Sequence, residues 1–196
     1  MCYNTNDLYL GSYLAGLFEG DGHIAIKDKR LKNPKPTFHI TFHKKDLPLA
    51  EKLHDLIRLR ANCKVGSVYV HKSNNSCVLN IYSVPGLITV VSLINNHLKT
   101  PKAQSIDLII DWLNRRHNAQ LDYIIRCVKP ICKSAWLTGF TDADGCFSID
   151  LRRKPRFKLS CAWQLNQRQI SATSESYEQC LDTIIEFLCA RQLYHP

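Results

Sequence analysis

The segment Leu14-Ala-Gly-Leu-Phe-Glu-Gly-Asp-Gly22 has a counterpart later in the chain, Leu137-Thr-Gly-Phe-Thr-Asp-Ala-Asp-Gly145. The two segments align without a gap, at a constant offset of 123 residues. Each begins with leucine, has glycine at its third position and ends in Asp-Gly. A duplicated segment of this kind indicates two copies of one structural unit within the chain.

Small residues recur at every fourth position through both segments, which places them on one face of a helix. They are Ser12, Gly16 and Gly20 in the first copy and Ala135, Gly139 and Ala143 in the second. Glycine inside a helix costs ~1 kcal/mol relative to alanine. The pattern therefore predicts that the two helices pack against each other, closer than the usual axis separation of about 8–10 Å, with pseudo-twofold symmetry. A stripe of small residues by itself could equally reflect ordinary packing in the protein core.

The last two residues of each copy predict a helix end with an acidic group. Gly22 and Gly145 stand where a helix-ending residue with positive φ is expected. Parallel packing of the helices would bring Asp21 and Asp144 together at one shared end. Two carboxylates at a helix C-terminus repel each other and the helix dipole. Divalent cations between them would offset that cost, and oxygen ligands suit Mg²⁺ or Mn²⁺.

Alternating apolar residues and a basic, proline-containing turn follow each copy, as expected for a strand pair with one buried and one open face. Further expected elements are helices at Leu47–Arg60, Pro85–His97, Pro101–Leu113 and Ser176–Ala190, and strands at Val65–His71 and Cys77–Tyr82. The first unit then spans 8–118, a linker 119–134, and the second unit 135–196. The second unit stops after its first helix, so its sheet should have two strands and an exposed edge. The fold class is α+β.

Composition favours a folded chain with a polyanionic partner. The 196 residues include 26 Lys plus Arg against 17 Asp plus Glu, for a formal charge of +9. Nine cysteines without a Cys-x-x-Cys pair argue against a zinc site and indicate a reducing compartment; Cys146, Cys161 and Cys180 lie in apolar patterns and are expected in the core. We expect no membrane span, and no signal or transit peptide in the first residues.

The two segments resemble the twin signatures of the LAGLIDADG homing endonucleases of the single-chain, organelle-intron-encoded type. The resemblance implies tandem αββαββα units, the second incomplete, whose antiparallel sheets form a saddle in the DNA major groove. It also implies that Asp21 and Asp144 bind the metal and cut one DNA strand each, with carbonyls of Gly20 and Ala143 as further ligands. Glu19 and Asp142 would have a structural role at the helix ends.

Three further residues acquire expected roles from the resemblance. Gln167 fits a position after the second strand that orders catalytic water, although a solvated side chain is an even alternative. The aligned residue of the first unit is Asp46, which is equally well suited to cap the next helix. Lys102 fits a basic catalytic residue beneath the cut site, with a surface lysine as the alternative. The matching lysine of the second unit would lie past Pro196.

Open strand faces should read base edges, because a two-stranded ribbon fits the major groove. The candidates are Lys27, Lys29, His39, Thr41, His43, Tyr69, His71, Asn80, Arg152, Lys158, Ser160, Gln164 and Asn166. Basic residues in the hairpin turns are expected at phosphates instead: Lys32, Lys35, Arg153, Lys154 and Arg156.

Three functions fit these observations. The first is a monomeric, site-specific endonuclease that hydrolyses double-stranded DNA at a long asymmetric target. The second is a maturase that binds intron RNA. The third is a truncated relic that binds DNA without cutting it. Localisation in the mitochondrion, or the chloroplast, with synthesis inside the organelle, follows from the resemblance alone.

Overall fold

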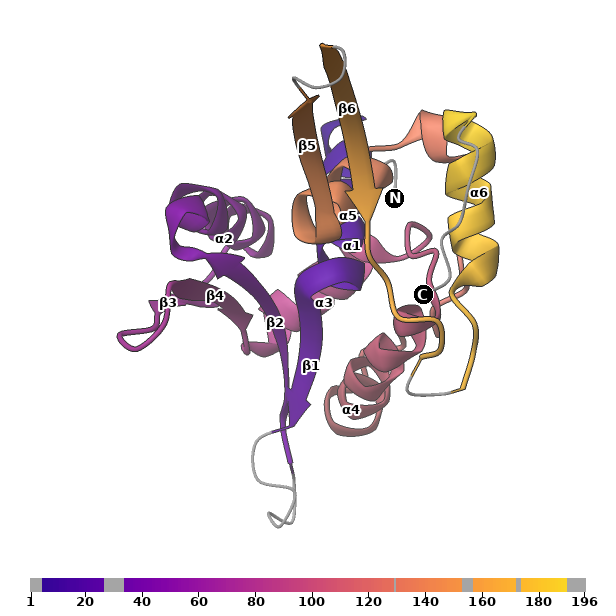
Figure 1. Cartoon of the computed structure of the whole chain (residues 1–196). Coiled ribbons are helices and arrows are strands. Elements are labelled where there is room, and N and C mark those ends of the chain that lie inside the picture. The colour runs from indigo at the N-terminus through magenta and orange to yellow at the C-terminus, as the bar shows by residue number, and fades with distance from the viewer. Residues whose placement is uncertain (1–4, 27–33, 129, 153–156, 172–173, 190–196) are drawn as a thin grey trace.

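A computed structural model describes residues 5–26, 34–128, 130–152, 157–171 and 174–189. Its elements are arranged around a central pair of helices, α1 (Thr5–Asp21) and α5 (Trp136–Asp144), with one sheet on each side of the pair (Figure 1). Along the described part of the chain, no helix has the length and apolar character needed to cross a bilayer.

The small-residue stripes of α1 and α5 pack against each other in parallel and in register. The Ala135 amide donates to Ser12 Oγ at 3.0 Å. A Cβ added to Gly16 would lie 2.1 Å from the Trp136 carbonyl oxygen, and one added to Gly139 would lie 2.1 Å from the Tyr13 carbonyl oxygen. The near-identical clearances confirm the predicted close contact and its pseudo-twofold symmetry.

The first sheet has four antiparallel strands in the order β1-β2-β4-β3. They are β1 (Gly22–Ile26), β2 (Pro36–His43), β3 (Gly66–Val70) and β4 (Ser76–Ile81). One face is buried beneath α1 and α2 (Leu47–Ala61), and α3 (Val84–Ile94) packs on these two helices. The apolar residues of this face include Phe38, Ile40, Leu79 and Ile81, each 0% exposed. The alternation seen in the sequence thus separates a core face from an open one.

The second sheet contains two strands, β5 (Gly145–Arg152) and β6 (Lys158–Leu165), among the residues described. This confirms the expected two-stranded sheet with a free edge. The last helix, α6 (Glu178–Leu188), packs near the short 3-10 turn η3 (Ile131–Lys133) instead of covering the strands. In Figure 1 the β5–β6 ribbon extends away from the rest of the chain.

The expectation that Cys146 and Cys161 lie in the core is wrong, because both are exposed. The apolar side chains of the same ribbon are also exposed, with Phe147 at 77% and Ile149 at 75%. No helix in the described ranges covers this ribbon as α1 and α2 cover the first sheet. Cys180, on α6, is partly buried.

The predicted positive φ of Gly22 and Gly145 is also wrong, since no glycine in the described ranges has a positive φ. Each helix passes directly into a strand, and Gly145 has φ −86° and ψ 152°. Glycine is required by space instead. A Cβ at Gly22 would lie 2.6 Å from the Phe18 carbonyl oxygen, and one at Gly145 would lie 2.6 Å from the Thr141 carbonyl oxygen.

Some expected boundaries shift. The helix expected at Pro85–His97 is α3, and it ends at Ile94. The helix expected at Pro101–Leu113 divides into a 3-10 segment, η2 (Pro101–Ile106), and α4 (Asp107–His117). A short 3-10 turn, η1 (Lys44–Asp46), precedes α2. Asp46 occupies the N-cap position of α2, but its side chain makes no capping hydrogen bond.

Candidate functional site

Asp21 and Asp144 end the two packed helices and lie near each other. A Cβ added to Gly20 would lie 3.0 Å from Asp144 Oδ2. Partial desolvation and the charge of Asp144 raise the pKa of Asp21 to about 6, against the opposing charge of Lys102. Desolvation also raises the pKa of Asp144. The predicted pairing of the two acids is therefore present, with the electrostatic cost expected of it.

Lys102 lies beside this carboxylate pair. The side chain of Thr100 caps η2, which carries the lysine back toward α1. Lys102 Nζ donates to the Gly20 carbonyl oxygen at 2.5 Å and to the Glu19 carbonyl oxygen at 3.2 Å. Desolvation lowers the pKa of the ammonium group, while Asp144, Glu19 and Asp21 act to raise it. Lys102 is thus a partly buried cation held at the end of α1, not a freely solvated lysine.

Gln167 and Asp46, which align in the sequence, have different surroundings. Gln167 follows β6 and donates its side-chain amide to Asp144 Oδ2. Asp46 lies at the N-cap position of α2, and no hydrogen bond to Asp21 is formed there among the residues described. The two units therefore differ at this position, and the amide is present on the Asp144 side.

Glu19 is fully buried and joins α1 to two distant segments. Its carboxylate accepts hydrogen bonds from the Lys99 amide, the Thr100 amide and hydroxyl, and the Trp136 indole. Burial raises the pKa of Glu19, and the bonds from Thr100, Lys99 and Trp136 oppose that rise. Because every partner is a donor, the network favours the carboxylate and supports a structural role for Glu19.

The bond between Trp136 of α5 and Glu19 of α1 has an equivalent in which the two helices exchange roles. Trp136 and Tyr13 are separated by the repeat offset, and so are Asp142 and Glu19. Trp136 Nε1 donates to Glu19 at 2.5 Å, and the Tyr13 hydroxyl donates to Asp142 Oδ2 at 2.8 Å. Glu19 and Asp142 are thus each bound by an aromatic donor from the other helix. The sequence analysis missed this pair, although the shared offset of two aromatic donors was a usable signal.

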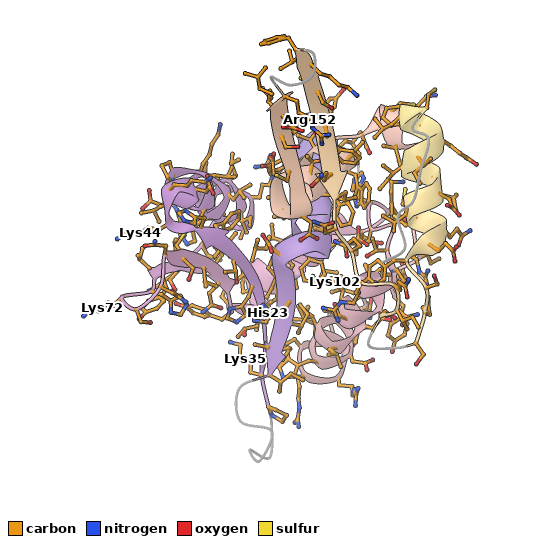
Figure 2. The ribbon with its side chains drawn as sticks, in the orientation of Figure 1. His23, Lys35, Lys44, Lys72, Lys102 and Arg152 are labelled. Carbon is orange, nitrogen blue, oxygen red and sulfur yellow. The ribbon has the colours of Figure 1, made fainter. Side chains whose placement is uncertain are left out.

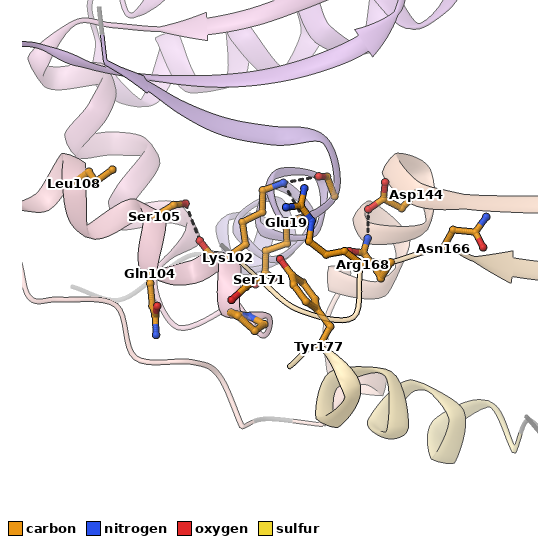
Figure 3. A pocket seen from close by; sticks show the side chains of 13 residues that line it. Glu19, Lys102, Gln104, Ser105, Leu108, Asp144, Asn166, Arg168, Ser171 and Tyr177 are labelled. Atoms are coloured by element: carbon orange, nitrogen blue, oxygen red, sulfur yellow. Dashed lines mark hydrogen bonds between the residues drawn. The ribbon is translucent and has the colours of Figure 1, made fainter. Parts of the chain in front are cut away.

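A cavity of about 580 Å³ opens beside the acidic helix ends. Its lining includes Gly20, Lys102, Asp144, Gln167 and Arg168 (Figure 3). Arg168 was not among the residues singled out from the sequence, because nothing in its local pattern distinguishes it from other basic residues of a basic chain. Asp21 is not part of the lining, and it lies exposed at the end of α1.

The carboxylate pair fits a divalent cation whose remaining ligands come from outside the protein. Among the residues described, no cluster of three or more His, Cys, Asp or Glu side chains could hold a metal. Mg²⁺ is commonly bound by one or two carboxylates together with water and substrate phosphates. The Gly20 carbonyl oxygen already accepts a hydrogen bond from Lys102, so it has one remaining lone pair for a further contact. Ala143 lies against Gly20 at the helix contact.

The open face of the first sheet carries the predicted polar residues in adjacent rows. His39 pairs with His23 on one side and Asn80 on the other, while Thr41 and Tyr69 both pair with Val78. His43 ends β2, and His71 directly follows β3. Figure 2 shows basic side chains along this side of the chain, including Lys35, Lys44 and Lys72. Lys27, Lys29 and Lys32 lie outside the described residues.

In the β5–β6 ribbon, the residues predicted to contact DNA lie on one face. Strand alternation places Arg152, Lys158, Ser160 and Gln164 together, since Arg152 pairs with Lys158 and Gln164 with Cys146. Arg152 Nε also forms an ion pair with Asp150 at 2.9 Å. Asn166 follows the end of β6 and lines the cavity. Arg153, Lys154 and Arg156 lie outside the described residues.

The chain belongs to the LAGLIDADG endonuclease family, whose model matches residues 14–113 and 137–195. Nucleases of this family use divalent metal ions. The fold and the two signatures are thus those expected from the resemblance.

Three relatives show the range of proteins similar to this chain. The intron-encoded DNA endonuclease aI3 of Saccharomyces cerevisiae is 34% identical over 72% of this chain and 36% of its own length. The uncharacterized cox1 intron-2 37.2 kDa protein of Schizosaccharomyces pombe is 28% identical over 84% of this chain and 48% of its own. The intron-encoded RNA maturase bI4 of S. cerevisiae is 24% identical over 81% of this chain and 23% of its own length. The chain therefore spans half or less of these relatives.

The fold matches that of solved meganucleases. The LAGLIDADG meganuclease I-AabMI, bound to uncleaved DNA, superposes with a TM-score of 0.70 over 95% of this chain and 75% of its own. Sequence identity is 17%, so the match concerns the fold. It confirms the predicted α+β architecture with antiparallel sheets.

Proposed function

We propose that this chain is a site-specific endonuclease that cuts both strands of DNA beside the shared end of α1 and α5. The observation that carries the proposal is the closeness of Asp21 and Asp144, whose charges repel strongly enough to contribute to the raised pKa of Asp21. A fold that keeps two repelling carboxylates together, instead of separating them, is typical of a cation site.

Asp21 and Asp144 would hold a divalent metal, with the Gly20 and Ala143 carbonyls as additional oxygen ligands. Bound Mg²⁺ or Mn²⁺ supplies a nucleophilic water at neutral pH and stabilises the leaving oxygen. Lys102 would place a positive charge near the scissile phosphate, where negative charge develops during hydrolysis. Gln167, which contacts Asp144, would orient water on that side.

The open strand faces would bind the target. Direct base contacts are proposed for the polar rows of the first sheet and the matching face of β5 and β6, because no helix in the described part of the chain covers those faces. The residues are Lys27, Lys29, His39, Thr41, His43, Tyr69, His71, Arg152, Lys158, Ser160, Gln164 and Asn166. The net charge of +9 supports a polyanionic partner.

A maturase is the second candidate, and the similarity to an RNA maturase favours it. The packed signature helices serve either function, because they position the two units relative to each other. The exposed apolar side chains of the β5–β6 ribbon favour a third outcome, in which DNA binds but is not cut. Action as a monomer in the mitochondrion or chloroplast is proposed from the intron-encoded relatives.

One experiment separates the candidates. The chain is incubated with DNA that joins the two exons flanking its coding intron, with Mg²⁺ or with EDTA. Staggered double-strand breaks are expected with Mg²⁺, and Asp21→Asn or Asp144→Asn should abolish them. Asp142→Asn is the matched control, since Asp142 is the exposed acid bound by Tyr13, and it should cut normally.

Other results would reject the endonuclease. Tight binding of folded intron RNA without cleavage of any DNA would support the maturase. Binding of the exon DNA without cleavage in Mg²⁺ or Mn²⁺ would support the non-cutting relic. Cleavage that survives both Asp→Asn changes would place the chemistry at another site.

A further inference from the structure

The Tyr177 side chain is almost wholly buried, yet its hydroxyl group has no partner among the residues described. The side chain is 5% exposed and lines the cavity beside the acidic helix ends. Within the described ranges its hydroxyl forms no hydrogen bond. A buried tyrosine hydroxyl usually has a partner, and even the more exposed Tyr13 donates to Asp142 at 2.8 Å. The Tyr177 hydroxyl therefore has a donor to offer to a ligand in the cavity.

Main-chain hydrogen bonds hold Tyr177 in place at the start of α6. Its amide donates to the Gln169 carbonyl oxygen at 3.0 Å, and its carbonyl oxygen accepts from the amides of Cys180 and Leu181 at 3.1 Å each. These bonds join the segment after β6 to the first turn of the helix. Figure 3 shows the ring extending from this point into the cavity. The hydroxyl is thus positioned by the fold before any ligand binds.

The groups around the hydroxyl favour an anionic acceptor. Lys102 and Arg168 supply positive charge to the same cavity. Of the acids in the described lining, Glu19 is bound by buried donors and Asp144 by a side-chain amide. Desolvation raises the pKa of Tyr177, against the opposing charge of Arg168, so the hydroxyl keeps its proton at neutral pH. A protonated hydroxyl beside two cations is suited to donate to a phosphate oxygen.

We propose that the Tyr177 hydroxyl donates a hydrogen bond to a phosphate oxygen of bound DNA at the cavity beside Asp144. This assignment rests on the proposed function, because DNA supplies the phosphate. Tyr177 is then an uncharged substrate-contacting residue, from a segment outside both signatures and both sheets. Because the fold already holds the donor in place, little freedom is lost when the phosphate binds.

Removal of the hydroxyl should weaken DNA binding and leave folding unchanged. Tyr177→Phe keeps the ring and breaks no hydrogen bond among the residues described, so Tm should match that of the wild-type chain. The Kd for a duplex of the joined exons, measured in EDTA, should rise about tenfold. The slope of log K against log salt should not change, because a hydroxyl releases no counterion.

Tyr9→Phe is the matched control, because it removes the same group from an exposed position near the start of α1. Its Kd should equal that of the wild-type chain. A lower Tm for Tyr177→Phe would show that the hydroxyl is bonded within the protein, and would overturn the assignment. An unchanged Kd, or an equal loss for Tyr9→Phe, would also overturn it.

Neutral phosphate substitutions locate the contact. Methylphosphonates replace the phosphates of the duplex one at a time, and the loss of affinity caused by Tyr177→Phe is measured on each duplex. The loss should fall to about twofold or less at one position and persist elsewhere, because donor and acceptor belong to one bond. The same loss at every position would contradict a phosphate contact.

The binding measurements also separate this assignment from the proposed function. If the wild-type chain binds the duplex but never cuts it, the proposed endonuclease fails, while the methylphosphonate series still decides whether Tyr177 contacts a phosphate. If the wild-type chain does not bind the duplex, both proposals fail.

Discussion

Lys102 donates its ammonium group to the main-chain carbonyl oxygen of Gly20 at 2.5 Å, directly beside the residue that ends α1. The contact holds a cation next to Asp21 and Asp144 without forming an ion pair with either side chain in the described structure. The ammonium group remains within electrostatic reach of both acids. Its charge is therefore available to the substrate.

Replacing Lys102 with methionine should reduce the cleavage rate by roughly 10²-fold, in line with the loss of one positioned charge in a transition state. The methionine keeps an unbranched apolar side chain of similar length, so folding should be retained. Single-turnover cleavage at saturating protein measures the effect. Lys133→Met, at an exposed lysine of η3, should cut at the wild-type rate. A loss of affinity that accounts for the whole defect would contradict a role at the scissile phosphate.

The paired carboxylates should make stability depend on pH in a particular direction. The folded chain holds the Asp21 proton more tightly than the unfolded chain, because the folded-state pKa is raised to about 6. This group therefore favours folding at low pH, and its contribution is lost as the pH rises through about 6. In EDTA, Asp21→Asn should raise Tm at pH 8, and the gain should shrink toward pH 4. A gain that is equal at both pH values would be inconsistent with the repulsion.

The contact between Gly20 and Ala143 can be tested by exchanging the two side chains. A Cβ on Gly20 would lie 2.3 Å from Ala143 Cβ, so Gly20→Ala should destabilise the chain by about 1–3 kcal/mol. Adding Ala143→Gly should recover much of that loss, since one methyl group again occupies the contact. Denaturant unfolding of both single variants and the double variant gives the coupling energy. Additive effects would show that the helices do not meet at this pair.

Gly16→Ala is the control for the exchange of the Gly20 and Ala143 side chains. The added Cβ would meet the main-chain oxygen of Trp136 at 2.1 Å, and no side-chain deletion removes that atom. The loss of stability should therefore persist when Gly16→Ala is combined with Ala143→Gly. Recovery in that combination would mean that the helices simply move apart.

Buried Glu19 should contribute more to stability than its repeat partner Asp142. Glu19→Gln places an amide donor among the Lys99, Thr100 and Trp136 donors, so we expect a loss of about 1–3 kcal/mol. Asp142→Asn disturbs one exposed bond from Tyr13 and should cost ~0.5 kcal/mol or less. Equal losses in denaturant unfolding would reject the structural role of the Glu19 network.

The sequence predicted the site best where the repeat itself carried the information. The stripes that contain Gly16 and Gly139, the pairing of Asp21 with Asp144 and the open face of β2 all follow from local periodicity and duplication. Lys102 and Gln167 required the family resemblance, and the structure places both beside the carboxylates. Their roles remain predictions.

Features that depend on long-range contacts were not predictable from local patterns. The alternation in β5 correctly indicated a strand, but Cys146 is exposed because burial depends on a covering helix that α6 does not supply. The positive φ of Gly22 was inferred from a common helix-ending motif, whereas α1 passes directly into β1. Arg168 lines the cavity only because the segment after β6 lies near Lys102 of η2 and the end of α5.

Mapping of both cut strands in the exon-junction DNA most directly tests whether the two helix ends form one composite active site. The measurement compares the wild-type chain, Asp21→Asn and Asp144→Asn in Mg²⁺ on a denaturing gel. We predict a staggered break with the wild-type chain, and for each variant a cleavage loss of at least roughly 10²-fold on one strand or both. Full cutting of both strands by either variant would contradict the account.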